Sequence, residues 1–227
     1  MSGTFITFEG VDGSGKSTHL RLLSNFLQSD GFDVVVTREP GGTPVGNRLR
    51  AALLDGLEEV DPLTELLVFA ADRAQHVRRV LRPAIEEGRV VISDRYADAT
   101  AAYQGAGRGF SSELISEIIE LATEGLKPDL TLLFDVSITE SNTRTSRRTN
   151  GTHAGDRLDR ETLEFHTRVR DAYIALAEAE PERVKVVNTG RPVEETQQRV
   201  REIIVPFLVS RGHGQVNQKP AEASAKK

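Results

Sequence analysis

The sequence of 227 residues contains no cysteine, which excludes disulfide bonds, catalysis by a cysteine thiolate and zinc sites built on cysteine. It also lacks an apolar run of about 18 residues, and its N-terminus does not join a charged segment to an apolar one. We therefore expect neither a membrane span nor a secretory signal, and the cytoplasm as the compartment. An excess of basic residues is missing as well. The net charge of −5 predicts no nucleic-acid partner and favours a small-molecule substrate that is reached by local positive charge.

Five short runs rich in apolar and β-branched residues alternate with stretches of helical period. The runs cover residues 5–8, 34–37, 89–93, 130–135 and 184–187. This alternation is typical of the α/β class and predicts a five-stranded parallel sheet flanked on both faces by helices. Functional residues of such sheets gather at the C-terminal ends of the strands. This rule places Glu9, Arg38, Asp94 and Asp135 along one edge.

Outside the strands, three features shape what we expect of the chain. Residues 1–211 suit one large domain with a sizeable core, and residues 212–227, which are polar and aperiodic, predict a disordered tail. Residues 143–159 are charged, poor in helical pattern and too many for a plain turn. Apolar residues at helical spacing predict core-facing stripes on four helices, and the longest stripe consists of Leu63, Leu67, Ala70, Ala74, Val77 and Leu81.

A glycine-rich segment between the first predicted strand and a predicted helix carries the strongest signal. It matches the pattern G-x-x-x-x-G-K-[ST] in full. With the following threonine it comprises Gly10, Val11, Asp12, Gly13, Ser14, Gly15, Lys16, Ser17 and Thr18. In this geometry backbone N–H groups surround a phosphate at the positive end of a helix. Lys16 would reach the outer phosphates and the Ser17 hydroxyl would hold Mg²⁺, so the segment predicts a nucleoside-triphosphate site.

The ends of other predicted strands carry further charged residues. Asp94 precedes Arg95, so a carboxylate for a metal and a guanidinium for phosphate stand side by side. Asp135 competes for the metal role, and an Asp-Arg pair can also merely cap a turn. Arg38 precedes a Pro-Gly turn, where it is either a phosphate clamp or a solvated side chain. The segment alone does not decide between the two.

For three more groups of residues, a functional and a purely structural interpretation compete. Phe69 and Arg73 share a helix face and can hold a base, although their spacing alone favours a core phenylalanine beside an exposed arginine. Tyr103 and Gln104 belong to a glycine-rich loop that either lines a nucleoside pocket or only connects two elements. Five arginines form either a solvated face or, as the phosphate loop favours, a lid over transferring phosphates. They are Arg144, Arg147, Arg148, Arg157 and Arg160.

In order along the chain, these segments resemble the motifs of thymidylate kinases. The resemblance extends over residues 5–176. It is carried by the phosphate loop at 8–18, the second-strand segment at 37–43, the metal and phosphate motif at 94–96, the nucleoside-pocket segment at 102–105 and the fourth strand at 128–136. It implies a three-layer P-loop kinase fold and a homodimer packed through helices. It also implies Mg²⁺-dependent transfer of the γ-phosphate of ATP to dTMP, which gives dTDP for dTTP synthesis.

The resemblance further implies roles for residues around the acceptor nucleoside. Phe69 would stack on thymine and Arg73 would bond a thymine carbonyl. Asp12 would meet the 3′-hydroxyl of the sugar, Tyr103 would crowd the 2′ position and Gln104 would approach the base.

On the phosphate side, the resemblance implies that Arg38 and Arg95 hold the acceptor phosphate, with Tyr96 in the same segment. Some thymidylate kinases carry an arginine inside the phosphate loop. This chain does not, and it fits the type that places catalytic arginines in the lid, here near residues 143–159. The implied catalytic set is Lys16, Arg38, Arg95, Arg144, Arg148 and Arg157, and the implied metal ligands are Ser17 and Asp94.

Two alternatives remain: another nucleoside or nucleotide kinase of the same fold, and a P-loop NTPase that is not a kinase. The guanine-reading N-K-x-D segment of many GTPases does not occur in the chain. The acidic balance disfavours a nucleic-acid ATPase.

Overall fold

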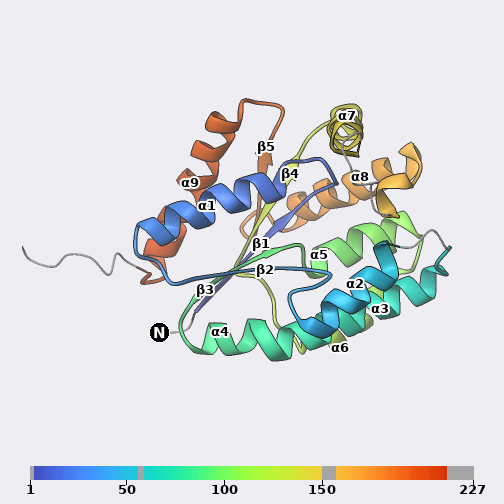
Figure 1. Ribbon diagram of the computed structural model, residues 1–227, viewed down its shortest axis with the longest axis horizontal. Coiled ribbons are helices and arrows are strands. Elements are labelled where there is room, and N and C mark those ends of the chain that lie inside the picture. The colour runs from blue at the N-terminus through green and yellow to red at the C-terminus, as the bar shows by residue number, and fades with distance from the viewer. Residues whose placement is uncertain (1–2, 56–58, 150–156, 214–227) are drawn as a thin grey trace, which may run out of the picture.

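The computed structural model describes residues 3–55, 59–149 and 157–213, without the side chains of residues 148 and 149. Its centre is a five-stranded parallel sheet in the order β2-β3-β1-β4-β5 (Figure 1). The strands are β1 Thr4–Glu9, β2 Val34–Arg38, β3 Val90–Asp94, β4 Leu130–Asp135 and β5 Val184–Asn188. Each begins and ends within one residue of its predicted run, so the predicted sheet is confirmed.

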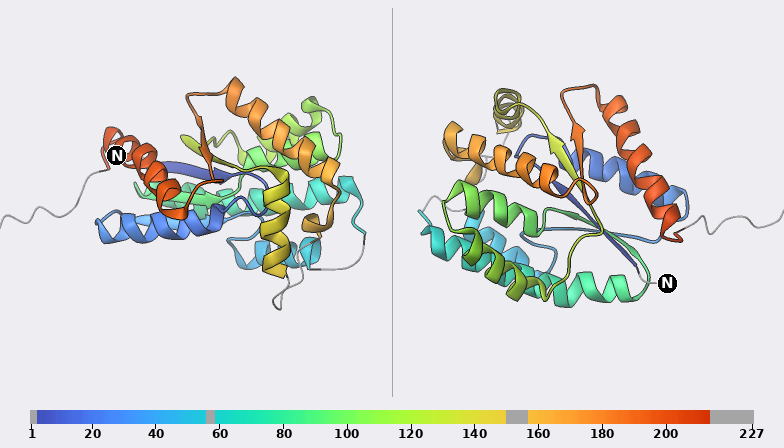
Figure 2. Two further views of the ribbon diagram at one scale, coloured as in Figure 1. Left: turned by 90° about the horizontal axis from the view of Figure 1, so that it is seen from above. Right: turned by 180° about the vertical axis from the view of Figure 1, so that it is seen from behind.

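Helices join the strands and cover both faces of the sheet (Figure 2). The longer ones are α1 Lys16–Ser29, α2 Pro44–Leu54, α3 Pro62–His76, α6 Ser112–Thr123, α7 Ile138–Thr149, α8 Leu163–Ala179 and α9 Val193–Ser210. The shorter segments are the π-helical Val77–Leu81 and Ala101–Gly107, α4 Arg82–Glu86, α5 Ala97–Thr100 and the 3-10 turn Leu158–Arg160. Within the described ranges, no helix is both long and apolar enough to cross a membrane.

Side-chain caps and prolines fix where the helices around the sheet edge begin. Thr43 Oγ1 accepts a hydrogen bond from the N–H of Gly46 at 2.8 Å, and Asp61 Oδ1 accepts one from the N–H of Leu63 at 2.9 Å. Each cap satisfies an N–H group that has no partner inside its helix. A proline stands in the first turn of both α2 and α3, where its missing N–H costs nothing.

The alternation of side chains along the strands separates the cores on the two faces of the sheet. One face packs with α1 and α9, which lie side by side in Figure 1, and its core includes Ile6, Phe8, Leu23, Ile92 and Ile204. The other face packs with α8 and with the helices that follow α3, and its cores include Phe5, Val77, Val91, Leu133 and Val169. The result is the predicted three-layer arrangement of helices, sheet and helices.

The order of the strands reverses beside β1, because β3 pairs with it on one side and β4 on the other. Parallel sheets open a crevice at the C-terminal strand ends where the order reverses. The register pairs Phe8 of β1 with Asp94 of β3, and Arg38 of β2 with the same Asp94. Three strands therefore deliver the phosphate loop, Arg38 and Asp94 to one edge, as the sequence predicts.

The buried face of α3 differs from the predicted stripe. Leu63 and Leu67 are each 48% exposed, whereas Glu65 is fully buried. The prediction holds only at the end of the stripe, where Val77 and Leu81 are buried. The predicted stripe fails over α3 because charged residues share the buried face of this helix with Leu66 and find polar partners there, as Glu65 does with Gln104 and Arg73 with Glu39.

Two further expectations need correction. Residues 143–149 are not poor in helix but belong to α7, which is supported by an ion pair between Glu140 and Arg144 one turn apart. The predicted tail begins at Gly212, yet His213 Nε2 lies 2.7 Å from Thr4 Oγ1 and the backbone N–H of His213 donates to the Leu208 carbonyl. Residues 150–156 of the predicted lid and 214–227 of the predicted tail lie outside the described residues.

Candidate active site

The phosphate loop bends at positions that demand glycine. Gly10 has a φ of +133°, and a Cβ at this position would lie 2.3 Å from the carbonyl oxygen of Phe134. Gly13 has a φ of +73°, and its Cβ would lie 2.6 Å from the carbonyl oxygen of Ser141. Side chains at these positions would face both backbone strain and a clash with neighbouring backbone. The loop therefore packs closely against the ends of β4 and α7.

Lys16 lies at the floor of this loop, at the start of α1. Its Nζ donates hydrogen bonds to the carbonyl oxygens of Gly10 and Val11, each at 2.8 Å. Burial and, next, the positive charge of Arg95 lower the pKa of Lys16 to about 8. The side chain is thus held at the loop as a cation over most of the neutral pH range.

Ser17 and Asp94 meet where α1 begins and β3 ends. The Ser17 hydroxyl donates to Asp94 Oδ2 at 2.8 Å. A hydroxyl and a carboxylate oxygen are hard ligands of the kind that Mg²⁺ takes beside phosphate oxygens, so this pair fits the predicted metal site. The competing Asp135 instead accepts hydrogen bonds from Nε and Nη2 of Arg170, at 2.7 and 2.9 Å, which favours Asp94.

Arg95 follows β3 in a left-handed backbone conformation, with a φ of +72°. Such a conformation is costly for a residue other than glycine and often marks a functional site. The turn aims the guanidinium back at the phosphate loop, where it donates to Asp12 Oδ1 at 2.8 Å, to the Gly10 carbonyl at 3.0 Å and to the Tyr103 hydroxyl at 3.0 Å. Tyr103 in turn donates to Asp12 Oδ2 at 3.0 Å.

Asp12 stays ionised in this arrangement. Burial by itself would raise the pKa of Asp12, but the charges of Arg95 and Lys16 and the Tyr103 hydrogen bond hold it well below its usual value. Asp12, which lies far from Arg95 and Tyr103 in the sequence, therefore forms one compact charged cluster with them.

Glu9 lies beneath this cluster and is fully buried at the end of β1. Its two oxygens accept hydrogen bonds from the N–H of Tyr96 and from the Tyr173 hydroxyl, both at 2.7 Å. The Tyr173 hydroxyl also lies 3.3 Å from Arg95. Burial and the nearby charge of Asp98 raise the pKa of Glu9 to about 8, so the side chain is protonated in the neutral range.

A pocket extends from the Asp12–Arg95 cluster toward α3. We call it the acceptor pocket. It is lined by Asp12, Glu39, Pro40, Arg50, Leu54, Phe69, Arg73, Arg95, Tyr96, Ala99, Thr100, Tyr103, Gln104 and Leu158. The structure thus brings Phe69, Arg73, Tyr103 and Gln104 together around one cavity. The Tyr103 segment is the π-helical Ala101–Gly107 rather than the predicted loop, and its role at a nucleoside stays a prediction.

Arg73 is 2% exposed, contrary to the exposed arginine that the spacing alone favours. Its guanidinium pairs with Glu39 at 2.8 Å and donates to Thr100 Oγ1 at 2.8 Å and to the Tyr96 carbonyl at 2.9 Å. Oε1 of Glu39 also lies within hydrogen-bond distance of His76 Nδ1, at 2.8 Å. Three of the five N–H groups of Arg73 are thereby engaged, and the side chain enters the pocket in a fixed orientation.

Gln104 and Arg157 meet at Glu65, the buried carboxylate of α3. Gln104 Nε2 donates to Glu65 Oε1 at 2.8 Å, and Arg157 forms an ion pair with Glu65 Oε2. Arg157 also donates to the Leu53 carbonyl at 3.0 Å. The structure therefore places this predicted catalytic arginine behind the acceptor pocket rather than at the phosphate loop.

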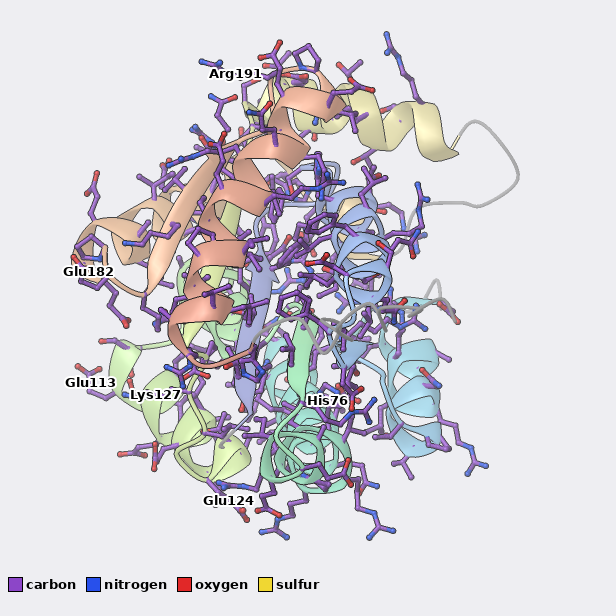
Figure 3. All side chains as sticks on the ribbon, turned by 90° about the vertical axis from the view of Figure 1, so that its left-hand side faces the viewer. His76, Glu113, Glu124, Lys127, Glu182 and Arg191 are labelled. Carbon is purple, nitrogen blue, oxygen red and sulfur yellow. The ribbon has the colours of Figure 1, made fainter. Side chains whose placement is uncertain are left out.

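A second, larger cavity opens over the phosphate loop, and we call it the donor cavity. It is lined by Asp12, Gly13, Gly15, Lys16, Ser17, Thr18, His19, Arg38, Glu39, Arg50, Asp94, Arg95, Arg144, Asp159, Thr189, Arg191 and Val193. Arg38 reaches it from the end of β2. Arg191, labelled in Figure 3, bounds it at the end of the molecule opposite Glu124. The two cavities share Asp12, Glu39, Arg50 and Arg95.

The predicted lid arginines take different positions. Arg144 lies at the donor cavity, where it donates to the carbonyl of Thr189 at 2.7 Å and approaches the carbonyl of Gly13 at 3.5 Å. Arg147 is exposed on α7. Arg148 lies in the same helix, and its side chain is outside the described part of the structure.

One family model, which describes thymidylate kinases, matches residues 8–200 of the chain. The chain belongs to the thymidylate kinase family. It is 48% identical over 217 residues to a thymidylate kinase of Desulfovibrio desulfuricans, covering 92% of this chain and 99% of that one. It is also 48% identical over 198 residues to a thymidylate kinase of Deinococcus radiodurans, covering 87% and 94%.

A solved structure supports the fold of this thymidylate kinase family member. The crystal structure of a thymidylate kinase from Ehrlichia chaffeensis aligns with a TM-score of 0.73 and 33% sequence identity. The alignment covers 90% of this chain and all of that one. The P-loop kinase fold predicted from the sequence is therefore confirmed.

Sequence reasoning placed Glu9 at the sheet edge but missed three other buried groups of the site. Glu39 follows a predicted strand, and that position is the signal by which it could have been found. Glu65 and Tyr173 carry no such signal, because both lie in helices whose patterns are dominated by apolar residues. Their contacts with Gln104 and Arg95 depend on how α3 and α8 pack, which one sequence does not encode locally.

Proposed function

We propose that the protein transfers the γ-phosphate of ATP to dTMP, with Mg²⁺, and releases dTDP and ADP. The observation that carries this proposal is the junction of the two cavities. The acceptor pocket and the donor cavity share Asp12 and Arg95, so that a monophosphate in one and a triphosphate in the other would meet at a charged cluster. Membership of the thymidylate kinase family supports dTMP as the acceptor.

In this proposal the residues around the junction position two anions and screen their repulsion. Lys16 and the loop N–H groups bind the donor phosphates, while Arg95 and Arg38 bind the acceptor phosphate. An ionised oxygen of the acceptor phosphate forms the new bond to the γ-phosphorus, and the bond to the oxygen bridging to the β-phosphorus breaks. The attacking oxygen needs no general base because it is already ionised, and positioning and electrostatics supply the catalysis.

The side chains of Ser17 and Asp94 would hold Mg²⁺ in this reaction. When bound, the ion neutralises charge on the donor phosphates. Both ligands are fixed by secondary structure, Ser17 in the first turn of α1 and Asp94 at the end of β3. Arg144 is the lid arginine with the best support, because it already lies at the donor cavity. Roles for Arg148 and Arg157 in a closed lid stay predictions.

The nucleoside would enter the acceptor pocket with its base between Phe69 and the polar groups of Arg73 and Gln104. Asp12 would receive the 3′-hydroxyl, and Tyr103 would occupy the space beside the 2′ position. Both are already tied to Arg95 by hydrogen bonds, so sugar and phosphate would contact one preformed cluster.

A steady-state assay with dTMP, dUMP, dCMP, AMP and thymidine as acceptors tests the proposal. We expect a clear preference for dTMP, and a preference for another acceptor would contradict it. Arg95→Ala should lower turnover with dTMP far more than it weakens ATP binding. The matched control is Arg78→Ala, because Arg78 is 67% exposed and pairs with Glu124 away from both cavities. A selective loss of ATP binding in Arg95→Ala would refute the acceptor-side role of Arg95.

We also propose a homodimer that forms through helices. Its support is the apolar surface of α3 and α6, which pack together and carry Leu63, Leu67 and the 77% exposed Leu121. Light scattering coupled to size-exclusion chromatography should give twice the chain mass, and Leu67→Glu should shift it toward the monomer. A monomeric wild type would contradict the proposal. The cytoplasmic location stays a prediction that cell fractionation would test.

A further inference from the structure

A buried carboxylate that phosphoryl transfer does not use lies behind the acceptor pocket. Glu65 of α3 is fully buried and surrounded by hydrogen-bond donors. Its Oε1 accepts from Gln104 Nε2 at 2.8 Å and from Arg108 Nε at 3.2 Å. Its Oε2 accepts from Arg108 Nη2 at 2.9 Å and pairs with Arg157. Two arginines and one amide thus converge on one carboxylate.

Glu65 is ionised, and an ionised carboxylate only accepts hydrogen bonds. Burial by itself would raise the pKa of Glu65, but the hydrogen bonds from Arg108, Arg157 and Gln104 hold it below its usual value. The amide of Gln104 must therefore turn its NH₂ group toward Glu65, since the opposite orientation would set two acceptors against each other. The oxygen and NH₂ ends of a glutamine amide have nearly the same shape, so shape alone does not fix how the amide is turned. Here the carboxylate of Glu65 fixes it.

The other end of the Gln104 amide is the carbonyl oxygen Oε1. Gln104 is 2% exposed and lines the acceptor pocket. No donor among the described residues forms a hydrogen bond to Oε1, in contrast to Nε2. The atom is therefore an acceptor that is left for a ligand in the pocket.

We propose that Glu65 is a specificity-determining positioning residue, which holds Nε2 of Gln104 and so presents Oε1 to the base. This inference rests on the proposed function. Thymine and uracil carry an N–H donor at ring position 3, whereas cytosine carries an acceptor nitrogen there. An acceptor fixed by Glu65 pairs with the first two bases and opposes the third. A site with a fixed buried polar group rejects a base that leaves this group unpaired.

The variant Glu65→Gln tests this role. Its carboxamide can donate to Gln104, so the Gln104 amide is free to rotate and to present Nε2 to the base. We expect the ratio of kcat/KM for dTMP over dCMP to fall roughly tenfold, the effect of about one hydrogen bond. The ratio of dTMP over dUMP should stay unchanged, because both bases carry the N–H group. The matched control is Glu161→Gln, which alters another carboxylate on Arg108, at 2.6 Å, and should change neither ratio.

A double-mutant cycle separates this role from a general structural one. Gln104→Leu should itself lower the dTMP/dCMP ratio, and adding Glu65→Gln to it should lower the ratio no further. An equal loss with all three nucleotides in Glu65→Gln, or a further loss of the ratio in the double variant, would overturn the inference. If Glu65→Gln is not obtained folded, an unchanged ratio in Gln104→Leu also overturns it.

Failure of the proposed function would look different. A wild type that does not phosphorylate dTMP would contradict that function. The inference on Glu65 would then be decided by calorimetric affinities for dTMP and dCMP in the same variants, with the same expected change in their ratio.

Discussion

Replacing Glu9 by glutamine should remove a pH dependence of stability that this single carboxyl group imposes on the protein. The side chain is fully buried, and burial together with the charge of Asp98 raises its pKa from 4.5 to about 8. The folded protein therefore keeps a proton on Glu9 over a range in which the unfolded chain has lost it. Glutamine keeps the size of the side chain and an acceptor for the N–H of Tyr96 but has no such proton to lose.

The direction and size of the effect follow from the number of bound protons. Between the unfolded and folded pKa values the folded state binds about one proton more, so its free energy of unfolding falls by about 1.36 kcal/mol per pH unit as the pH rises. The contribution of Glu9 is complete below pH 4.5 and is lost as the pH rises through about 8. From about pH 6 to about pH 7.5, the wild type should lose about 2 kcal/mol relative to E9Q.

Urea unfolding followed by circular dichroism measures this difference, and the method suits a chain without tryptophan. Both pH values lie above the sequence pI of 5.6, which keeps the protein away from its lowest net charge. Glu117→Gln, at an exposed position on α6, is the control and should show the pH dependence of the wild type. A difference between E9Q and wild type that is the same at both pH values would show that Glu9 is ionised in the fold and refute the reasoning.

Three other substitutions test the two cavities. Asp94→Asn should raise the Mg²⁺ concentration for half-maximal rate about tenfold, because it removes the charge beside Ser17; an unchanged Mg²⁺ titration would count against the metal site. Gly10→Ala should lower the melting temperature by roughly 5 °C and abolish ATP binding in calorimetry, because its Cβ meets the Phe134 carbonyl; normal ATP affinity would contradict this account of the loop. Phe69→Ala should raise KM for dTMP about tenfold through lost stacking and leave KM for ATP unchanged. Equal effects on both substrates would contradict the role of Phe69 in the acceptor pocket.

The strands and the phosphate loop could be predicted from the sequence because their signals are local. Each strand is a short apolar run, and the loop is a contiguous pattern with glycine at positions such as Gly10, where φ is positive. Parallel pairing then places the strand ends together without knowledge of the side-chain contacts. For the same reason Asp94 could be placed beside the loop before its contact with Ser17 was known.

The face of α3 could not be predicted in this way. Its leucines and its charged residues both recur at helical spacing, and hydrophobicity alone selects Leu63 and Leu67 for the core. The structure buries Glu65 and Arg73 instead, because each meets partners from distant segments, such as Gln104 and Glu39. A buried charge that is fully hydrogen-bonded looks in sequence like an exposed one, so only the packing of α3 against the sheet edge reveals the difference.

The hydrogen bonds that fix Arg95 affect how tightly an acceptor phosphate can be held. When a ligand fixes an arginine side chain that moves freely in solvent, the loss of rotamer entropy costs up to about 2 kcal/mol. Arg95 is already fixed before any ligand arrives, by Asp12, Tyr103 and the Gly10 carbonyl. An incoming phosphate therefore binds a side chain that loses little further conformational entropy, so more of the contact energy contributes to the affinity.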